Sequence, residues 1–235
     1  MSDKEILENN EEVENTVEVL SDAEAQRKRM IQFALAGLAV LAVLIGGFLF
    51  YRYTKQNTEK EAALKLSRIR PFYDAGQLEV ALGGVSGTIR GESVIGLTAI
   101  SSQFGSSESG RLAALYAGNA LSTLGRYSEA ERYFDQATAS GSDITKMGAL
   151  AGLASCRATG NQHEAAAKLY EEASAIGAKL GDEDRYKLFA ALHYEKAGQK
   201  DKAIALYRAI AGSPEFSEAV NDAKAGIIRL GGTLE

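Results

Sequence analysis

The apolar and polar positions along the chain divide it into two parts of different character. Residues 31–50 read IQFALAGLAVLAVLIGGFLF, twenty residues with no charge and one polar side chain, Gln32. A helix of that length spans about 30 Å, the thickness of the hydrocarbon core of a bilayer. Twelve of the twenty are Leu, Ile, Val or Phe, whose transfer into a bilayer is favourable. The pattern predicts a transmembrane helix rather than a buried core helix, because a core helix this long usually carries a polar stripe.

A cleaved signal peptide is the other interpretation of such a run, but its apolar core is only about 7–15 residues long and a small-residue cleavage site follows it. Here Tyr51, Arg52 and Tyr53 follow, an aromatic and basic group suited to the headgroup region. We therefore expect an uncleaved signal anchor over residues 27–53. Basic residues flank the run at both ends at similar density and favour a cytoplasmic N-terminus only slightly, and we place the N-terminus in the cytoplasm and the large domain outside it.

After the anchor, one pattern of small, apolar and turn-forming residues returns three times. Its first copy is LYAGNALSTLGRYSEAERYFDQA, residues 115–137, and its third is LFAALHYEKAGQKDKAIALYRAI, residues 188–210. Aligning Gly125 with Gly198 also aligns Phe134 with Tyr207. The middle copy places Gly160 in the same slot, with a register that is ambiguous by one residue.

This pattern resembles the tetratricopeptide repeat, a helix–turn–helix unit with a period of about 34 residues. The glycines would end each first helix in a left-handed conformation, which costs glycine little. The aromatic residues, Phe134, Tyr170 and Tyr207, would fill the space between successive hairpins. Residues 217–230 carry an apolar stripe that suits a terminal capping helix.

The segment before the repeats predicts a degenerate first hairpin. Residues 59–75 read as a helix that bends or ends near Pro71, and residues 93–104 as a second helix. Between them ALGGVSGTIRG, residues 81–91, has too many glycines for a stable helix, so we expect a flexible linker there.

The predicted fold class is therefore all-α, with an N-terminal transmembrane helix followed by a tetratricopeptide-type α-solenoid and a C-terminal capping helix. The expected domains are an acidic disordered tail (1–26), the anchor (27–53), a helical linker with the degenerate hairpin (54–110), and the repeats with the capping helix (111–235).

Charge is concentrated in the tail. Residues 1–26 contain nine acidic and one basic side chain, a local charge of −8, which indicates disorder. From residue 30 onward the 22 basic and 22 acidic side chains balance, so nucleic acid is not an expected partner.

Candidate chemistry is sparse. His163 and His193 lie thirty residues apart in different predicted helices, without the spacing of a metal site. Cys156 falls where the repeat buries a small apolar residue, and the GGVSGT segment is neither a nucleophile elbow nor a phosphate loop. We expect no catalytic residue, no cofactor and no metal, and hence a protein that is not an enzyme.

Stacked hairpins of this kind present a concave face formed by the first helix of each pair. The repeat register places both apolar and isolated polar side chains there, which suits an extended or helical peptide. The candidate partner-binding residues are Leu115, Asn119, Ser122, Thr123, Arg157, Arg185, Leu188, Phe189, Leu192 and Glu195, with Leu150 and Ala154 beside Arg157 in the middle copy.

The anchor, the ALGGVSG segment and the stretch GLTAISSQFGSSESGRLAALYAGNALSTLGRYSEA together resemble the ancillary SecYEG translocon subunit family. The resemblance implies a single-pass protein of the bacterial inner membrane with a cytoplasmic N-terminus and a periplasmic C-terminal domain. It also implies protein partners: translocon subunits, a periplasmic chaperone or unfolded client segments, with the lipid bilayer contacting residues 31–50. A scaffold for assembly of the cell envelope or the division complex is the alternative function.

Overall fold

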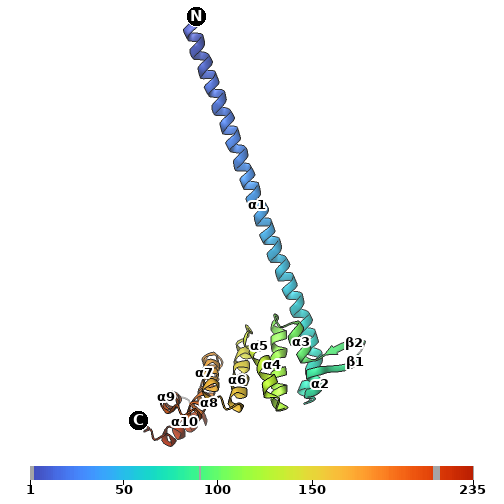
Figure 1. The fold of residues 1–235 in the computed structure, drawn as a ribbon, viewed down its shortest axis with the longest axis vertical. Helices are drawn as coiled ribbons and strands as arrows, with labels where there is room; N and C mark the ends of the chain where they lie inside the picture. The colour runs from blue at the N-terminus through green and yellow to red at the C-terminus, as the bar shows by residue number, and fades with distance from the viewer. Residues whose placement is uncertain (1–2, 90, 214–217, 235) are drawn as a thin grey trace. The chain divides into compact units, whose positions relative to one another are not determined.

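The computed structural model describes the backbone of residues 3–89, 91–213 and 218–234. Within those ranges it describes side chains from residue 40 onward, except at residue 89, and at residues 27, 30, 33, 35, 37 and 38. The chain divides into two units, residues 1–55 and residues 56–235. The paired helices belong to the second unit (Figure 1).

The first helix, α1, comprises Asp3–Asp74 and contributes residues to both units. The sequence predicts disorder for residues 1–26, whereas their described backbone is helical from Asp3 onward. Glutamate is a good helix former, and extending a helix costs far less than nucleating one, so the apolar segment can propagate helix into the tail. At the other end α1 continues through Pro71, whose carbonyl still accepts a hydrogen bond from the Ala75 N–H at 3.0 Å.

The described side chains in the apolar run of α1 have no protein packed over them in the first unit. Its described large residues are exposed, with Phe33 at 76% and Phe50 at 72% of their full accessible area. Across the residues that the structure describes, no helix has a window long and apolar enough to qualify as a membrane span. Residues 31, 32, 34, 36 and 39 lie outside the described side chains, and the anchor stays a prediction.

Seven helices after residue 107 form three antiparallel pairs and a final single helix, as the repeat pattern predicts. Each helix packs against the next in the chain (Figure 1). They are α4 (Glu108–Thr123) with α5 (Tyr127–Thr138), α6 (Asp143–Thr159) with α7 (His163–Gly177), α8 (Glu183–Lys196) with α9 (Lys200–Ala211), and α10 (Glu218–Arg229).

Inside each pair, the turn contains one residue in the left-handed backbone conformation. At every such turn that residue's N–H donates to the carbonyl three residues back, and the next N–H donates to the carbonyl five residues back. These bonds satisfy carbonyls that the end of a helix would otherwise leave unpaired. The left-handed residues are Gly76, Gly125, Asn161 and Gly198, with φ between 63° and 76°.

The middle copy therefore has a different register from the one that Gly160 predicts. Gly160 has a φ of −77°, and the left-handed position belongs to Asn161. Asparagine tolerates this conformation better than other residues with a side chain, because its short amide bonds locally. Every equivalent position in the second copy moves one residue later.

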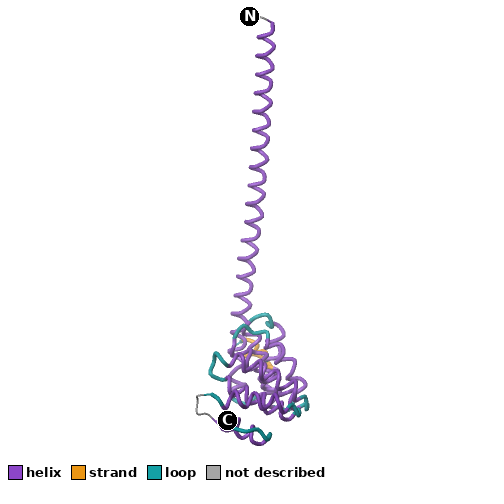
Figure 2. The backbone as a smooth tube through the Cα atoms, turned by 90° about the vertical axis from the view of Figure 1, so that its left-hand side faces the viewer, coloured by secondary structure: helices purple, strands orange, loops and turns teal. Residues whose placement is uncertain are grey.

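A further pair precedes these three. Its first helix is the last part of α1, before the turn at Gly76, and its second helix is split. That helix consists of α2 (Leu78–Gly83) and α3 (Leu97–Gln103), and the two strands β1 (Gly84–Ile89) and β2 (Glu92–Ile95) lie between them. The strands are antiparallel, with Thr88 opposite Ser93. Within the described residues this hairpin holds the strands of the fold (Figure 2).

The hairpin corrects both the all-α fold class and the flexible linker expected for residues 81–91. Glycines permit it, because a Cβ on Gly84 would lie 2.6 Å from the Val94 carbonyl oxygen and one on Gly96 would lie 2.1 Å from that of Leu82. Val94 is buried against the helices, and an ion pair from Arg68 holds Glu92. The glycine content that rules out a helix here is thus also what lets the two ends of the hairpin approach each other closely between α2 and α3.

Aromatic side chains fill the space between hairpins, as predicted. Phe134 is 1% exposed and Tyr207 is fully buried. The Phe134 ring lies between α4 and α6, where a Cβ on Gly118 would be 2.7 Å from it and a Cβ on Gly152 would be 2.3 Å from it. The two helices can therefore approach this ring only because both positions lack a side chain.

We predict opposite effects for two glycine substitutions in α6. Gly152→Ala should destabilise the fold by about 1–3 kcal/mol, because the new methyl overlaps a locked aromatic ring. Gly148→Ala is the matched control, since its Cβ would lie 3.5 Å from the nearest Leu115 carbon, an ordinary contact. It should stabilise α6 by about 0.5–1 kcal/mol through helix propensity. Denaturant unfolding of both variants measures the difference, and equal stabilities would contradict the packing described for Phe134.

Candidate protein-binding face

Seven of the ten predicted partner-binding residues lie at fixed distances before the left-handed residue of their turn. Leu115, Asn119, Ser122 and Thr123 precede Gly125 by ten, six, three and two residues. We call the residues at these positions in the four first helices the first-helix face. Its other members are Leu66, Arg70, Tyr73 and Asp74 in α1, Ala151, Ser155, Ala158 and Thr159 in α6, and Leu188, Leu192, Glu195 and Lys196 in α8.

In α4 the four predicted residues grade from half-buried to exposed. Leu115 packs against the core cluster beside α6, and Asn119 hydrogen-bonds the Tyr73 side chain. The Ser122 hydroxyl lies 3.7 Å from the Cys156 sulfur, and Thr123 is exposed with its hydroxyl donating to the Asn119 carbonyl. This part of the face is polar at its turn end and apolar at the other.

In α6 the shifted register changes which residues belong to the face. Leu150 and Ala154, expected there, are buried at 4% and 0% exposure. Arg157 is half-buried, pairs with Glu131 at 3.3 Å and donates to the Gln162 side chain at 3.1 Å. It is thus engaged between the helices of its own repeat and the previous one. The residues that follow them, Ala151, Ser155 and Ala158, are the small side chains that α6 contributes to the face.

In α8 four of the five predicted residues range from buried to exposed. Leu188 is buried at 8% exposure, whereas Arg185 is exposed, pairs with Asp182 at 3.5 Å and lies over the Tyr186 ring. Phe189 and Leu192 are half-buried. The Phe189 ring is 5.4 Å from that of Tyr170, so it extends an aromatic cluster to the surface.

Glu195 is held by the capping helix. Its carboxylate accepts two hydrogen bonds from the Arg229 guanidinium, at 2.7 and 2.8 Å, and one from the Tyr207 hydroxyl at 2.8 Å. The bonds from Arg229 hold the pKa of Glu195 below its ordinary value despite partial burial, and burial with the Glu195 bond raises the pKa of Tyr207. Glu195 therefore joins α8, α9 and α10.

The last turns of α1 supply a part of the face that the sequence predictions omit. A pocket of about 290 Å³ is lined there by Ala63, Leu66, Ser67, Arg70, Pro71 and Asp74. Beside it the Tyr73 and Tyr116 rings are 4.9 Å apart, and the Arg70 guanidinium lies over Tyr116. The signal was present in the sequence, because Gly76 stands at the same distance after these residues as Gly125 does after the α4 set.

The two histidines and the cysteine lie outside this face, and the histidines are much closer in space than in sequence. His163 and His193 lie in contact, with their Nδ1 atoms 3.3 Å apart. Cys156 is buried, and burial raises the pKa of its thiol, which disfavours a nucleophilic role. Within the described residues, no three His, Cys, Asp or Glu side chains gather as a metal cluster would.

The chain is similar to two solved structures of a protein from Podosopora anserina, described as a kinesin light chain with nearly identical TPR-like repeats. The sequence identities are 17% and 18%, and the TM-scores are 0.48 and 0.49. The matched regions cover 71% of this chain and 83% and 82% of the other two. No family model and no curated protein matches the chain. Its tetratricopeptide-type fold is evident from its own helix pairs and turns.

We predict that the Glu195 network stabilises the fold in a pH-dependent way. The pKa of Glu195 is lowered from 4.5 in the folded chain, so its contribution is complete above pH 4.5 and is lost as the pH falls through the folded value. Glu195→Gln should lower the free energy of unfolding by about 1 kcal/mol at pH 7, a value that allows for solvent screening because Arg229 is half exposed. The loss should become smaller as the pH falls.

Unfolding of wild type and Glu195→Gln between pH 7 and pH 3 measures this effect. Glu172→Gln, which makes the same charge change at an exposed position of α7, is the control and should shift stability little. A stability gap for Glu195→Gln that stays constant down to pH 3 would contradict the assigned role.

Proposed function

We propose that this chain is a non-catalytic adaptor that binds an extended segment of another protein on its first-helix face, while the apolar part of α1 holds it at a membrane. The observation that carries the proposal is the pocket at the end of α1, which continues the same set of positions that α4, α6 and α8 expose.

The side chains on this face, and those next to it in sequence on the same helices, suit a polypeptide ligand. Tyr73, Tyr116 and Phe189 are half-buried aromatics, and aromatic residues with arginine dominate protein-binding surfaces. Arg70 and Arg185 place guanidinium groups beside those rings. The small residues of α6 between them leave room for a backbone to pass close to the helix.

Membrane attachment is supported by the first unit taken alone. A helix that is apolar all round and uncovered by protein is stable only in an apolar environment. Its described side chains from Val40 to Phe50 are exposed, and Arg52 and Tyr53 follow them as interfacial residues do. A bilayer would cover this surface completely.

The finer proposal concerns the membrane and the partners. On the strength of the family resemblance, the membrane is the bacterial inner membrane, the N-terminus is cytoplasmic and the repeats are periplasmic. The segment bound would then come from a translocon subunit, an envelope chaperone or a chain emerging from the translocon. A scaffold for envelope or division-complex assembly would use the same face for a folded partner's extended loop.

Site-specific photo-crosslinking in intact cells tests the binding face. A photoreactive residue at Thr123 or Ser155, both exposed on the first-helix face, should capture one recurrent envelope protein. The same residue at Asp135, exposed on α5 and outside the face, is the matched control and should not capture it. Equal capture from all three positions, or random neighbours only, would refute the face as the binding site.

Protease accessibility tests the orientation. In spheroplasts, external protease should degrade residues 56–235 and leave a protected fragment that contains the N-terminal tail and the anchor. Intact cells with a closed outer membrane provide the control, and lysed spheroplasts show that the chain is cleavable. Protection of the repeats in spheroplasts would place them in the cytoplasm and remove periplasmic partners from consideration.

A further inference from the structure

Two histidines from neighbouring helices meet at one edge of the solenoid. His163 is the first residue of α7 and His193 lies in the last turn of α8. The two helices pack together over much of their length, which brings the imidazoles together across thirty residues of sequence. Their Nδ1 atoms are 3.3 Å apart and the ring centroids are 5.4 Å apart.

This separation suits two ligands of one metal ion. An imidazole nitrogen binds zinc at about 2.0–2.1 Å, so two nitrogens at a tetrahedral angle lie about 3.3 Å apart. Without a metal, one Nδ1–H donates to the other Nδ1 at this same distance, in a direction that the tautomers set. We propose that His163 and His193 form a binding site for a divalent transition-metal ion such as zinc, through both Nδ1 atoms.

The surroundings hold the pair in a form that can bind metal. His193 stacks on the ring of Tyr170 at 5.4 Å with 13° between the planes, which restricts its rotation. Neutral imidazole is the metal-binding form. Each ring would carry its single proton on Nε2 in the complex.

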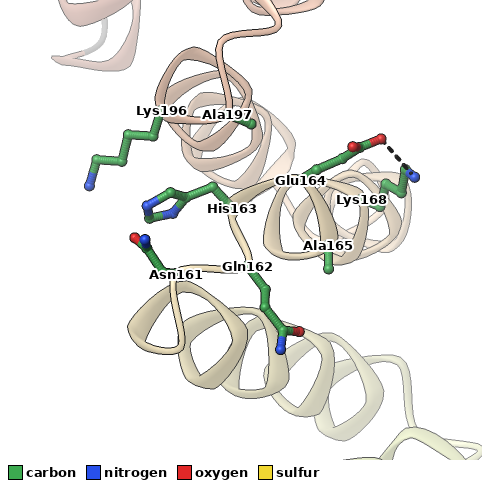
Figure 3. Close-up of a pocket in the computed structure, with 8 residues that line it drawn as sticks. All are labelled: Asn161, Gln162, His163, Glu164, Ala165, Lys168, Lys196 and Ala197. Atoms are coloured by element: carbon green, nitrogen blue, oxygen red, sulfur yellow. Dashed lines mark ion pairs between the residues drawn. The ribbon is translucent and has the colours of Figure 1, made fainter.

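The remaining coordination positions open to solvent. A pocket of about 710 Å³ adjoins His163 and is lined by Asn161, Gln162, His163, Glu164, Ala165, Lys168, Lys196 and Ala197 (Figure 3). Glu164 forms an ion pair with Lys168 at 2.9 Å, and Figure 3 shows its carboxylate directed away from the His163 ring. Water would complete the coordination, so the site would bind an exchangeable ion with two protein ligands.

Lys196 provides a further test, because its positive charge should weaken metal binding whereas the two histidines should strengthen it. It follows His193 by three residues in the last turn of α8 and lines the same pocket as His163, so its positive charge opposes a metal cation there. Removing the histidines should weaken binding, whereas removing this lysine should strengthen it. A nonspecific association of zinc with the acidic tail would respond to neither change.

The experiment is isothermal titration of the full-length chain, kept soluble in mild detergent, with Zn²⁺ at pH 7. The variants are His163→Gln, His193→Phe, which retains a ring beside Tyr170, and Lys196→Gln. We expect one site per chain whose affinity falls at least about tenfold in either histidine variant and rises severalfold in Lys196→Gln. Mg²⁺, which prefers oxygen ligands, is the control and should not occupy this site.

Circular dichroism of each variant establishes that it is folded, so a lost site cannot be attributed to unfolding. Zinc binding that is unchanged in both folded histidine variants would overturn the proposal. So would weaker binding in Lys196→Gln, since a lysine that helps to hold the ion indicates a different site. Neither result bears on partner binding at the first-helix face, because the two histidines lie outside it and Lys196→Gln leaves its aromatic and arginine side chains in place.

Discussion

Each helical hairpin of residues 56–235 depends on a residue in the left-handed conformation directly after its first helix. The same pair of backbone hydrogen bonds is made at Gly76, Gly125, Asn161 and Gly198. Because the turn fixes where the second helix starts, it also fixes which side of the first helix is left for the next hairpin. The register of the first-helix face follows from this one backbone constraint.

Packing between hairpins then relies on large rings opposite positions without side chains. Phe134 lies against Gly118 and Gly152, and Tyr207 lies against Gly226, where an added Cβ would be 2.6 Å away. Carboxylates reinforce the same stacking at the helix ends. Glu59 accepts hydrogen bonds from the backbone N–H groups of Glu108 and Ser109, and Glu108 accepts from Ser140 and Gly141. These acceptors satisfy N–H groups that a helix start leaves unpaired.

In this architecture some side chains hold neighbouring helices together, and others remain exposed. Residues at the joints, such as Arg157 and Glu195, hold helices together and have little left to offer a partner. Residues between the joints, such as Arg70, Thr123 and Phe189, remain available. The inserted β-hairpin enlarges the first repeat without disturbing the core, because the Thr98 hydroxyl still donates to the Leu82 carbonyl across the break in the second helix. Glu195 shows that a position of the first-helix face can serve to hold helices together, whereas Arg70 and Thr123 of the same face are exposed.

The sequence by itself determined the helical pairs after residue 107, the turns at Gly125 and Gly198, the aromatic residues between hairpins and seven of the sixteen positions of the first-helix face, all in α4 and α8. These features repeat and depend on interactions within a few residues, so local composition encodes them. Only the tertiary structure decided the register of the second copy, because glycine and asparagine both tolerate a left-handed turn and stand side by side at 160 and 161. It alone revealed the β-hairpin, the Glu195–Arg229 joint and the contact of His163 with His193. Those arise where packed helices bring distant residues together, and no periodicity along the chain records such a meeting.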